Sequence, residues 1–247
     1  MNNASKQTAA PDYGIDFPKE LRRNGLYGLG GVAMGIVLAL LAADGALGIV
    51  LSTVSLVSGI LLIANVAVSF RGSRSGKLRA RDQIIAQLPW RGDEQVLDIG
   101  CGHGLMLIGA AQRLTTGKAT GIDMWLQESQ WHNDSDATLA NASLAGVGDR
   151  VTVRRADARD LPYDNNAFDV VLSSWVIHTM TDPDDRAQVL KEIARVVKPG
   201  GRVVIVDFDF VNEYVKHFRD KDWKDVQKAG PNLLFVTPTY TMSAVKP

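Results

Sequence analysis

Residues 95–104 read QVLDIGCGHG, and this stretch decides the fold of the second half of the chain. The apolar run after Gln95 predicts a buried strand, and the glycines that follow it predict a sharp turn. Because glycine has no Cβ, the backbone of such a turn can approach a ligand closely. The residues from Leu105 to Leu114 then predict a helix. The order strand, glycine turn, helix indicates a ligand-binding loop of an α/β domain.

The glycine spacing separates this loop from the dinucleotide-binding fingerprint. That fingerprint is G-x-G-x-x-G, whereas the glycines here alternate as G-x-G-x-G from Gly100 to Gly104. An acidic residue, Asp98, also lies two residues before the first glycine, inside the end of the strand. Both details make a nicotinamide oxidoreductase the least favoured class.

Elements of alternating type surround this loop. We expect helices over 77–88, from Asp134 or Ser135 through 145, from Asp182-Pro183 onward, and over 211–219. We expect further strands over 118–122, 151–155, 168–172 and 203–207, with a terminal antiparallel pair over 223–228 and 240–246. Alternating strands and helices predict an α/β fold, a doubly wound and mostly parallel sheet, with ligands at the carboxyl ends of the strands.

Polar side chains occur where these strands end. Asp98, Asp123 and Asp157 end the first three predicted strands, and FDVVLSS, residues 168–174, ends the fourth. A carboxylate at such a place can accept hydrogen bonds from ribose hydroxyls or an amino group. A single acid of this kind is equally well a solvated loop charge, but four suitable strand ends in order favour one binding crevice.

This set of motifs resembles the class I S-adenosylmethionine-dependent methyltransferases. The resemblance covers roughly Gln95 to Asp207 and rests on VLDIGCGHG, GID, ADARDLP, FDVVLSS and LKEIARVVKPGGRVVIVD. It implies a Rossmann-like fold with a seven-stranded sheet and S-adenosyl-L-methionine as the cofactor. The positions it assigns to the cofactor are Asp98, Gly100, Gly102, Asp123, Met124, Asp157, Ala158 and Ser173.

The resemblance also implies a role for most of these positions. Asp98, Gly100 and Gly102 would hold the methionine part of the cofactor. Asp123 would bind the ribose, while Met124 packs on the adenine. The carboxylate of Asp157 would accept from the adenine amino group.

The FDVVLSS segment resembles the quinone, sterol and small-molecule branch of the family. The chain lacks the N-P-P-Y or D-P-P-Y signature of enzymes that methylate amino groups of nucleic acids and protein glutamines. Its 27 Lys and Arg balance 27 Asp and Glu, so net charge gives no argument for a nucleic-acid partner either. The single cysteine, Cys101, excludes an intramolecular disulfide and a multi-cysteine metal site, and we expect no metal.

Methyl transfer from a sulfonium is an in-line displacement, so the protein mainly positions the reacting groups. A general base is needed only when the acceptor enters with its proton. His178 is the candidate base, because it lies four residues after Ser174 and would share its side if that stretch were helical. The alternative is that His178 only orients the active-site loop. His103 lies within the glycine turn, and we expect it to have a structural role in the backbone there.

The other decisive feature precedes this domain. Residues 25–43 and 46–70 carry no formal charge, and between Asn24 and Phe70 the only charged side chain is Asp44, beside the turn residue Gly45. The first run would span roughly 28 Å as a helix, close to the ~30 Å hydrocarbon core of a bilayer. We therefore expect two transmembrane helices, with a buried hairpin of a soluble protein as the alternative.

Basic residues flank the expected spans only on one side. Lys19, Arg22 and Arg23 precede them, and five more follow, namely Arg71, Arg74, Lys77, Arg79 and Arg81. The positive-inside rule then places both termini in the cytoplasm and the basic residues beside membrane lipids. Small residues in each run, Gly31 and Gly35 in one and Ser55 and Gly59 in the other, allow close helix packing and are compatible with a homodimer.

The expected organisation is thus a cytoplasmic segment 1–24, a membrane hairpin 25–70, a basic linker and helix 71–94, and a methyltransferase domain 95–247. Tyr13 in the first segment is either a lid residue or part of a disordered leader. Residues 125–132 form either an acceptor wall or a satellite hydrophobic cluster.

The leading function is methyl transfer to a small or lipidic acceptor at the cytoplasmic membrane face. The alternatives are a membrane-tethered cofactor-binding module without turnover and a methyltransferase of a soluble small molecule.

Overall fold

The computed structural model describes residues 10–41, 45–125, 133–233 and 237–247. The chain divides into two compact units. We call residues 15–77 the helical unit, and residues 10–14, 78–233 and 237–247 the α/β unit. Asp44 and most of the expected acceptor wall, residues 126–132, lie outside the described residues.

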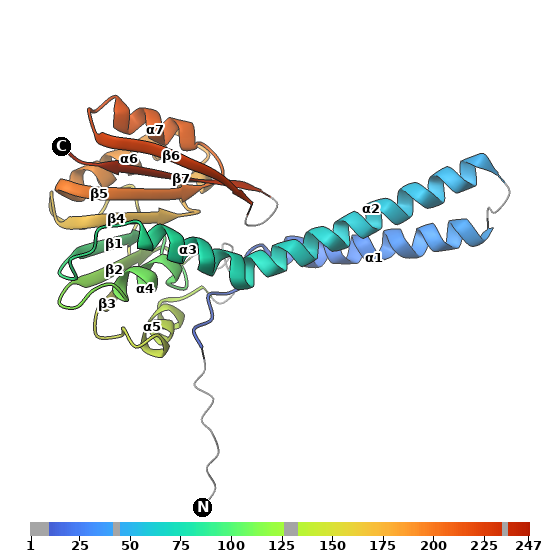
Figure 1. The fold of residues 1–247 in the computed structure, drawn as a ribbon, viewed down its shortest axis with the longest axis horizontal. Coiled ribbons are helices and arrows are strands. Elements are labelled where there is room, and N and C mark those ends of the chain that lie inside the picture. The colour runs from blue at the N-terminus through green and yellow to red at the C-terminus, as the bar shows by residue number, and fades with distance from the viewer. Residues whose placement is uncertain (1–9, 42–44, 126–132, 234–236) are drawn as a thin grey trace, which may run out of the picture. The chain divides into compact units, whose positions relative to one another are not determined.

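The helical unit is built from α1 (Pro18–Leu41) and α2 (Ala46–Arg71), which pack against each other along their lengths (Figure 1). Both helices are long and apolar enough to cross a membrane, judged by length and composition. Small residues allow their close approach. A Cβ added at Gly59 would lie 2.6 Å from the backbone nitrogen of Val32, and one at Gly35 would lie 2.8 Å from that of Leu56. The small residues therefore serve packing between α1 and α2 of one chain.

The boundaries of the helical unit differ from the expected ones. Helix α1 begins at Pro18, several residues before the uncharged run, since proline is well suited to the first helical turn. Helix α2 runs on through a π-helical turn, η1 (Gly72–Gly76), where a linker was expected, into α3 (Lys77–Ala86), which corresponds to the helix expected over 77–88. Lys77 is buried and forms a 3.0 Å ion pair with Asp16, which stabilises this end of the unit.

The α/β unit contains a seven-stranded sheet in the order β3-β2-β1-β4-β5-β7-β6. Its strands are β1 (Gln95–Ile99), β2 (Lys118–Asp123), β3 (Val151–Arg155), β4 (Phe168–Ser174), β5 (Val197–Asp207), β6 (Lys224–Leu233) and β7 (Pro238–Val245). Strands β1 to β5 are parallel, whereas β7 pairs antiparallel with both β5 and β6. This confirms the doubly wound, mostly parallel sheet and the antiparallel terminal pair.

The helices of this unit follow the expected order. They are α3, α4 (Leu105–Ala111), α5 (Ser135–Leu144), α6 (Pro183–Val196) and α7 (Val211–Arg219), with a short 3-10 turn, η2 (Ile177–Thr179). The side chain of Asp134 accepts from Ala137 N–H at 2.7 Å, so the predicted cap of α5 is confirmed. Strand β5 begins earlier than predicted, because the Pro199-Gly200-Gly201 segment lies within the strand as an irregularity opposite β4.

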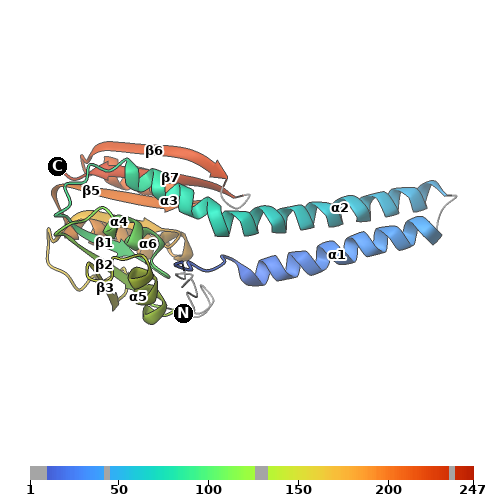
Figure 2. The same ribbon diagram turned by 60° about the horizontal axis from the view of Figure 1, so that its bottom comes forward.

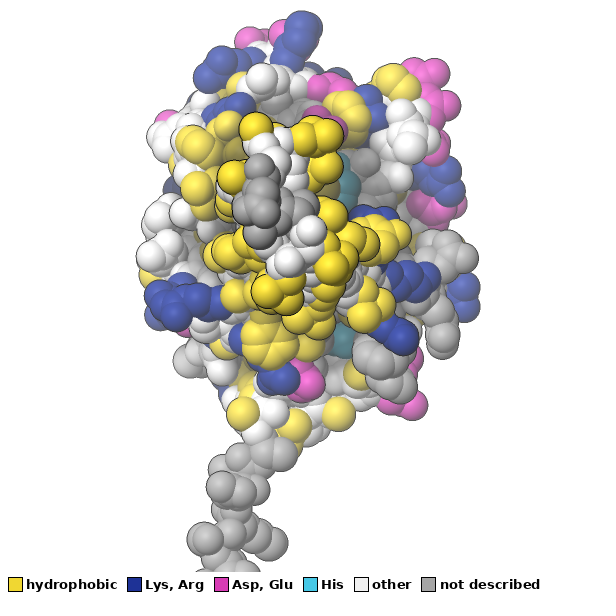
Figure 3. Space-filling model, turned by 90° about the vertical axis from the view of Figure 1, so that its right-hand side faces the viewer, with side chains coloured by type: hydrophobic (Ala, Val, Ile, Leu, Met, Phe, Trp, Pro, Cys, Tyr) yellow, Lys and Arg dark blue, Asp and Glu magenta, His cyan; other side chains and the backbone are white. Residues whose placement is uncertain are grey.

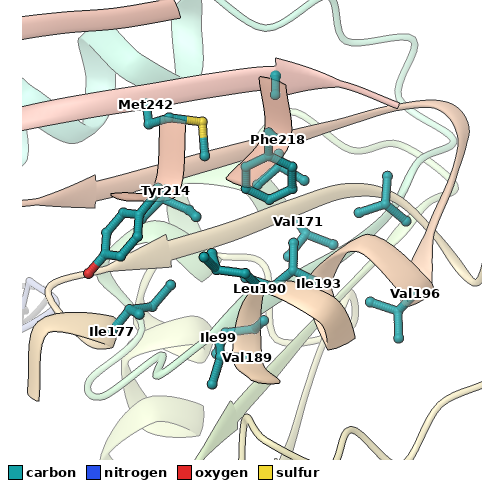
Figure 4. Packing of buried hydrophobic residues seen from close by; sticks show 14 of the residues in the cluster. Ile99, Val171, Ile177, Val189, Leu190, Ile193, Val196, Tyr214, Phe218 and Met242 are labelled. Carbon is teal, nitrogen blue, oxygen red and sulfur yellow. The ribbon is translucent and has the colours of Figure 1, made fainter. Parts of the chain in front are cut away.

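Helices cover both faces of the sheet (Figure 2). One core cluster joins side chains of α6 and α7 to alternate strand residues such as Leu97, Ile99 and Val171 (Figure 4). The other joins side chains of α4 and α5 to the intervening strand residues, among them Val96 and Leu172. Successive strand residues point to opposite faces, so both faces are apolar and both are buried.

Phe218 tests the contribution of the α7 face to stability. Its side chain is fully buried, and its ring lies 4.6 Å from that of Trp223, centroid to centroid. We expect Phe218→Ala to lower the free energy of unfolding by about 3–5 kcal/mol, through lost burial and the cavity left behind. Denaturant unfolding of the full chain in detergent, followed by tryptophan fluorescence, measures this. Leu144→Ala, at a half-exposed apolar position, is the matched control, and an equal loss in both variants would contradict the assignment.

Candidate active site

The predicted site residues lie at the carboxyl ends of neighbouring parallel strands. Asp98 and Gly121 are register partners in β1 and β2, and Asp123 pairs with Arg155 at the end of β3. On the other side of β1, Ile99 pairs with Ser173 of β4. The topology thus brings the ends of β1 to β4 to one edge of the sheet, as the sequence predicted.

The glycine loop, residues 100–104, connects β1 to α4. The N–H groups of Gly100 and Cys101 both donate to the carbonyl of Ile122, at 2.8 and 3.0 Å, which fixes the loop against the end of β2. Gly100 has a φ of +70°, and a Cβ there would lie 2.1 Å from Val176 Cγ2. Only glycine fits this position, because both the backbone conformation and the space exclude a side chain.

Asp98 is buried beneath the first turn of α4. Its Oδ2 accepts from Leu107 N–H at 2.8 Å, so it satisfies a donor at a helix start whose own N-cap, Gly104, offers no side chain. Burial raises the pKa of Asp98 to about 8, and the Leu107 hydrogen bond opposes that rise. Asp98 was expected to bind the methionine part of the cofactor. In the structure its carboxylate holds the glycine loop, which is itself expected to bind that part.

Asp123 ties the glycine loop to the end of β2. Its Oδ2 accepts from Gly102 N–H at 2.8 Å, and its Oδ1 accepts from Trp125 N–H at 2.6 Å. Each carboxylate oxygen has a further lone pair, and the residue is only partly buried, so it can still accept from a hydroxyl. Met124, beside it, leaves about 37% of its surface exposed, as an apolar side chain that packs on a ligand would.

Asp157 forms an ion pair with Arg159, a residue for which the sequence predicted no role. Its carboxylate accepts from the guanidinium of Arg159, with a 2.6 Å contact from Nη2, and Arg159 also reaches Asp185 at 2.9 Å. The hydrogen bonds from Arg159 lower the pKa of Asp157. Ala158 between them is buried. An adenine amino group would therefore share Asp157 with Arg159.

Ser173 lies on the opposite face of the sheet from Asp98. Residues alternate along β4, so its side chain joins the face covered by α6 and α7. It is buried, and among the described residues its hydroxyl has no hydrogen-bond partner. The structure therefore does not bring Ser173 to the same face of the sheet as Asp98.

His178 forms a close pair with Asp207, the last residue of β5. His178 Nδ1 lies 2.6 Å from Asp207 Oδ1, off the direction of a well-aligned hydrogen bond, and the backbone N–H of His178 donates to Oδ2 at 3.1 Å. Asp207 is fully buried, and it also accepts from Phe208 N–H and from the hydroxyl of Tyr214. Burial and the Asp207 charge raise the pKa of Tyr214, which stays protonated as a donor.

This pair corrects the reason given for His178. No helix connects Ser174 to His178: β4 ends at Ser174, Trp175 takes a left-handed φ of +56°, and the 3-10 turn η2 follows. Strand β5 positions the imidazole, because β4 and β5 are neighbours in register up to Ser174 and Val206. The acid at the end of the fifth predicted strand was the available signal for Asp207.

Three aromatic residues next to the strand ends have left-handed backbones. Trp125 after β2, Trp175 after β4 and Phe210 after β5 have φ values of +45°, +56° and +54°. Such conformations are uncommon for bulky residues and concentrate at functional sites. Trp125 also packs against the core on the α4 face, and the choice between an acceptor wall and a satellite cluster stays open because residues 126–132 lie outside the described residues.

The single thiol takes no part in this chemistry. Cys101 is buried within the glycine loop, and burial raises the pKa of its thiol, so it remains a neutral packing group.

The residues present fit S-adenosylmethionine. Asp123 can accept from ribose hydroxyls, Asp157 from an adenine amino group, and Met124 is an apolar surface for the base. The glycine loop passes between them without side chains at residues 100, 102 and 104.

Comparisons with known proteins agree with this site. Residues 97–205 match the family model described as Methyltransferase domain. The chain is 37% identical over 133 residues to the 27-O-demethylrifamycin SV methyltransferase of Amycolatopsis mediterranei, which covers 53% of this chain and 44% of the relative. It is 36% identical over 130 residues to the ubiquinone/menaquinone biosynthesis C-methyltransferase UbiE of Chromobacterium violaceum, with coverage of 53% and 49%. The aligned region thus spans about half the length of these relatives.

The fold is also shared with solved structures. Geranyl diphosphate C-methyltransferase from Streptomyces coelicolor A3(2), solved with geranyl diphosphate and S-adenosyl-L-homocysteine, has a TM-score of 0.56 at 15% identity. The similarity covers 73% of this chain and 82% of that one. The sheet order, the glycine loop and the family match lead to one assignment: the α/β unit is a class I S-adenosylmethionine-dependent methyltransferase domain.

Proposed function

We propose that the protein transfers a methyl group from S-adenosylmethionine to a small or lipidic acceptor at the cytoplasmic face of a membrane. The observation that carries the proposal is the carboxyl end of the parallel strands, where Asp98 in β1, Asp123 at the end of β2 and Asp157, two residues after β3, accompany a glycine loop. The His178–Asp207 pair, at the end of β5, adds a group that can handle a proton.

S-adenosylmethionine supplies a methyl group on a positively charged sulfur. The chain's own residues bind and orient. Asp123 accepts from the ribose, and its bonds to Gly102 and Trp125 keep both sides of that site in place. Asp157 accepts from the adenine amino group while Arg159 holds its carboxylate in a fixed orientation. Such positioning can contribute roughly 7–11 kcal/mol to the barrier reduction of a bimolecular transfer.

His178 takes the proton of a hydroxyl or acidic carbon acceptor. Asp207 lies beside Nδ1 of the imidazole, which leaves Nε2 as the ring atom that can accept the proton. The Phe208 ring lies 4.1 Å from the imidazole, centroid to centroid, and limits its movement. A base placed in this way typically contributes 10²- to 10⁴-fold in rate.

The relatives point to the acceptor class. By their names, those described above act on a demethylrifamycin and in ubiquinone and menaquinone biosynthesis, and a further relative is a sterol 4-C-methyltransferase. Quinones of this kind and sterols are apolar molecules. We therefore favour an acceptor that partitions into a membrane, with a soluble small molecule as the alternative, and a binding module without turnover as the second class of function.

The helical unit supports a membrane location. Its two helices of 24 and 26 residues would be about 36 and 39 Å long. Only 11% of the most apolar window of each is buried, whereas a core helix of a soluble protein would be mostly buried. In Figure 3, where the helix pair points toward the viewer, hydrophobic side chains cover it. Exposed apolar surface of this extent requires an apolar environment.

The charges of the helical unit support one orientation. Lys19, Arg22 and Arg23 are exposed at the start of α1, and Arg71 and Arg74 are exposed at the end of α2. Because the two helices run antiparallel, these five cations, which we call the basic collar, lie at one end of the hairpin. In the proposed orientation the collar and Tyr27 lie at the depth of the lipid headgroups, and by the positive-inside rule the collar supports a cytoplasmic location of both termini.

Asp123→Asn tests the cofactor site. The amide keeps the size of the side chain but replaces one accepting oxygen by a donor, which opposes the N–H groups of Gly102 or Trp125. We expect the Kd for S-adenosylmethionine to rise at least tenfold in calorimetry. Asp222→Asn is the matched control, because Asp222 is exposed and its left-handed φ of +58° suits asparagine. Absence of binding by the unchanged protein would refute the cofactor proposal.

His178→Ala tests turnover and the base together. The unchanged protein should transfer radiolabelled methyl from S-adenosylmethionine into either a total membrane lipid extract or a soluble metabolite extract. If the labelled product carries the methyl on oxygen or on an acidic carbon, we expect a 10²- to 10⁴-fold lower rate with an unchanged Kd for the cofactor.

The Asp207→Asn variant, alone and combined with His178→Ala, tests whether His178 and Asp207 act together. If the two residues act as one unit, the double variant should lose little more rate than His178→Ala alone. Full activity of His178→Ala on such an acceptor would refute the base. Label in the lipid extract favours the lipidic acceptor, and label only in the soluble extract favours the alternative.

Single introduced cysteines test the membrane topology. Cys101 is buried, so it gives little background to a membrane-impermeant maleimide. We expect Gly45→Cys to be labelled in intact cells and Asn24→Cys only after permeabilisation, because the hairpin places these positions on opposite sides. The reverse pattern, or release of the protein from membranes by carbonate, would contradict the proposal.

A further inference from the structure

Helix α5 holds the glycine loop through two side chains of one face. Thr138 and Asn141 are three residues apart, and both are buried. The Thr138 hydroxyl donates to the carbonyl of Gly102 at 2.5 Å, and Asn141 Nδ2 donates to the carbonyl of His103 at 3.0 Å. Two successive carbonyls of the loop are thereby fixed from outside.

The same Asn141 binds the N-terminal segment 10–14. Its Oδ1 accepts from Asp12 N–H at 2.9 Å, and its Nδ2 donates to the Asp12 carbonyl at 2.8 Å, across 129 positions of sequence. Both N–H groups and the oxygen of the amide are thus used. A single side chain bridges the backbone of residue 12 to the backbone of the glycine loop.

The residues after Asp12 are fixed against the same loop. Gly14 has a φ of +71°, and a Cβ there would lie 2.8 Å from His103 Nδ1, so the segment passes directly over that imidazole. Tyr13 is buried, its ring lies 5.6 Å from the Arg81 guanidinium, and its hydroxyl accepts from Arg81 at 3.4 Å. Burial raises the pKa of Tyr13. Three successive residues are therefore anchored in the α/β unit.

We propose that Asn141 is a positioning residue of the cofactor site, which couples the order of segment 10–14 to the order of the glycine loop. This inference rests on the proposed function, because the loop must bind S-adenosylmethionine for the coupling to have an effect. A cofactor that orders residues 100–104 then also orders residues 10–14, and loss of the bridge makes the cofactor bind to a less ordered loop. In this proposal Asn141 acts through the backbones of His103 and Asp12, to which its amide is hydrogen-bonded.

The test combines cofactor calorimetry with hydrogen exchange of the full chain in detergent. In the unchanged protein, S-adenosylmethionine should slow amide exchange in both 10–14 and 100–104. In Asn141→Ala, we expect the Kd to rise about tenfold and the protection of 10–14 by the cofactor to disappear. Asn141→Asp should be weaker still, because its carboxylate would face the carbonyls of Asp12 and His103.

Two further variants make the result specific. Thr138→Val removes the bond to Gly102 and leaves the bridge, so it should raise the Kd while residues 10–14 remain protected. Ser143→Ala, at an exposed position of α5, should change neither quantity. Unfolding midpoints of all variants report whether a loss of binding reflects a loss of fold. If Asn141→Ala does not fold, the exchange of residues 10–14 in the unchanged protein, with and without the cofactor, carries the test.

The two proposals fail in different ways. If the unchanged protein does not bind S-adenosylmethionine, the proposed function fails and the coupling fails with it. If the unchanged protein binds and Asn141→Ala binds equally well, or if the cofactor leaves the exchange of residues 10–14 unaltered in the unchanged protein, only the role of Asn141 is overturned.

Discussion

The hydrogen bond from Leu107 N–H to the buried carboxylate of Asp98 is the contact on which the site depends. It joins the end of β1 to the first turn of α4 and thereby fixes both ends of the glycine loop between them. The loop itself offers no side chain for this purpose, since Gly104 is the residue at the start of the helix. A carboxyl group in an apolar interior is unfavourable unless it is hydrogen-bonded or neutral, and the raised pKa of Asp98 reflects that conflict.

The remaining loop contacts build outward from this one. Ile122 binds two backbone N–H groups of the loop, Asp123 binds Gly102, and α5 binds the carbonyls of Gly102 and His103. These partners belong to two elements, the end of β2 and helix α5. The loop backbone is therefore held by several hydrogen bonds even though it is rich in glycine, and such contacts favour pre-organised binding of a small cofactor.

The elements that were predicted correctly are those that neighbouring residues in the sequence determine. The β3 strand, the start of α6 after Asp182 and the full span of α7 agree with their expected ranges, because apolar period, caps and turns are encoded by neighbouring residues. The strand-end acids also lie where the motifs predicted. The pairing of His178 with Asp207 and the bridge from Asn141 to Asp12 were not predicted, since each depends on which strands or segments become neighbours. The start of α1 at Pro18 was missed because charge, and not helix-start chemistry, defined the expected span.

The outermost strands carry a consequence for self-association. Strand β6 is exposed along nearly its whole length, but it contains Pro231 and the lysines Lys224 and Lys228. The opposite edge, β3, has five residues and ends in Arg154 and Arg155. Proline removes a backbone donor, and charged or short edges resist a further strand, so neither side of the sheet offers a template for another chain. Both outer strands of the sheet therefore disfavour pairing with a strand of a second copy.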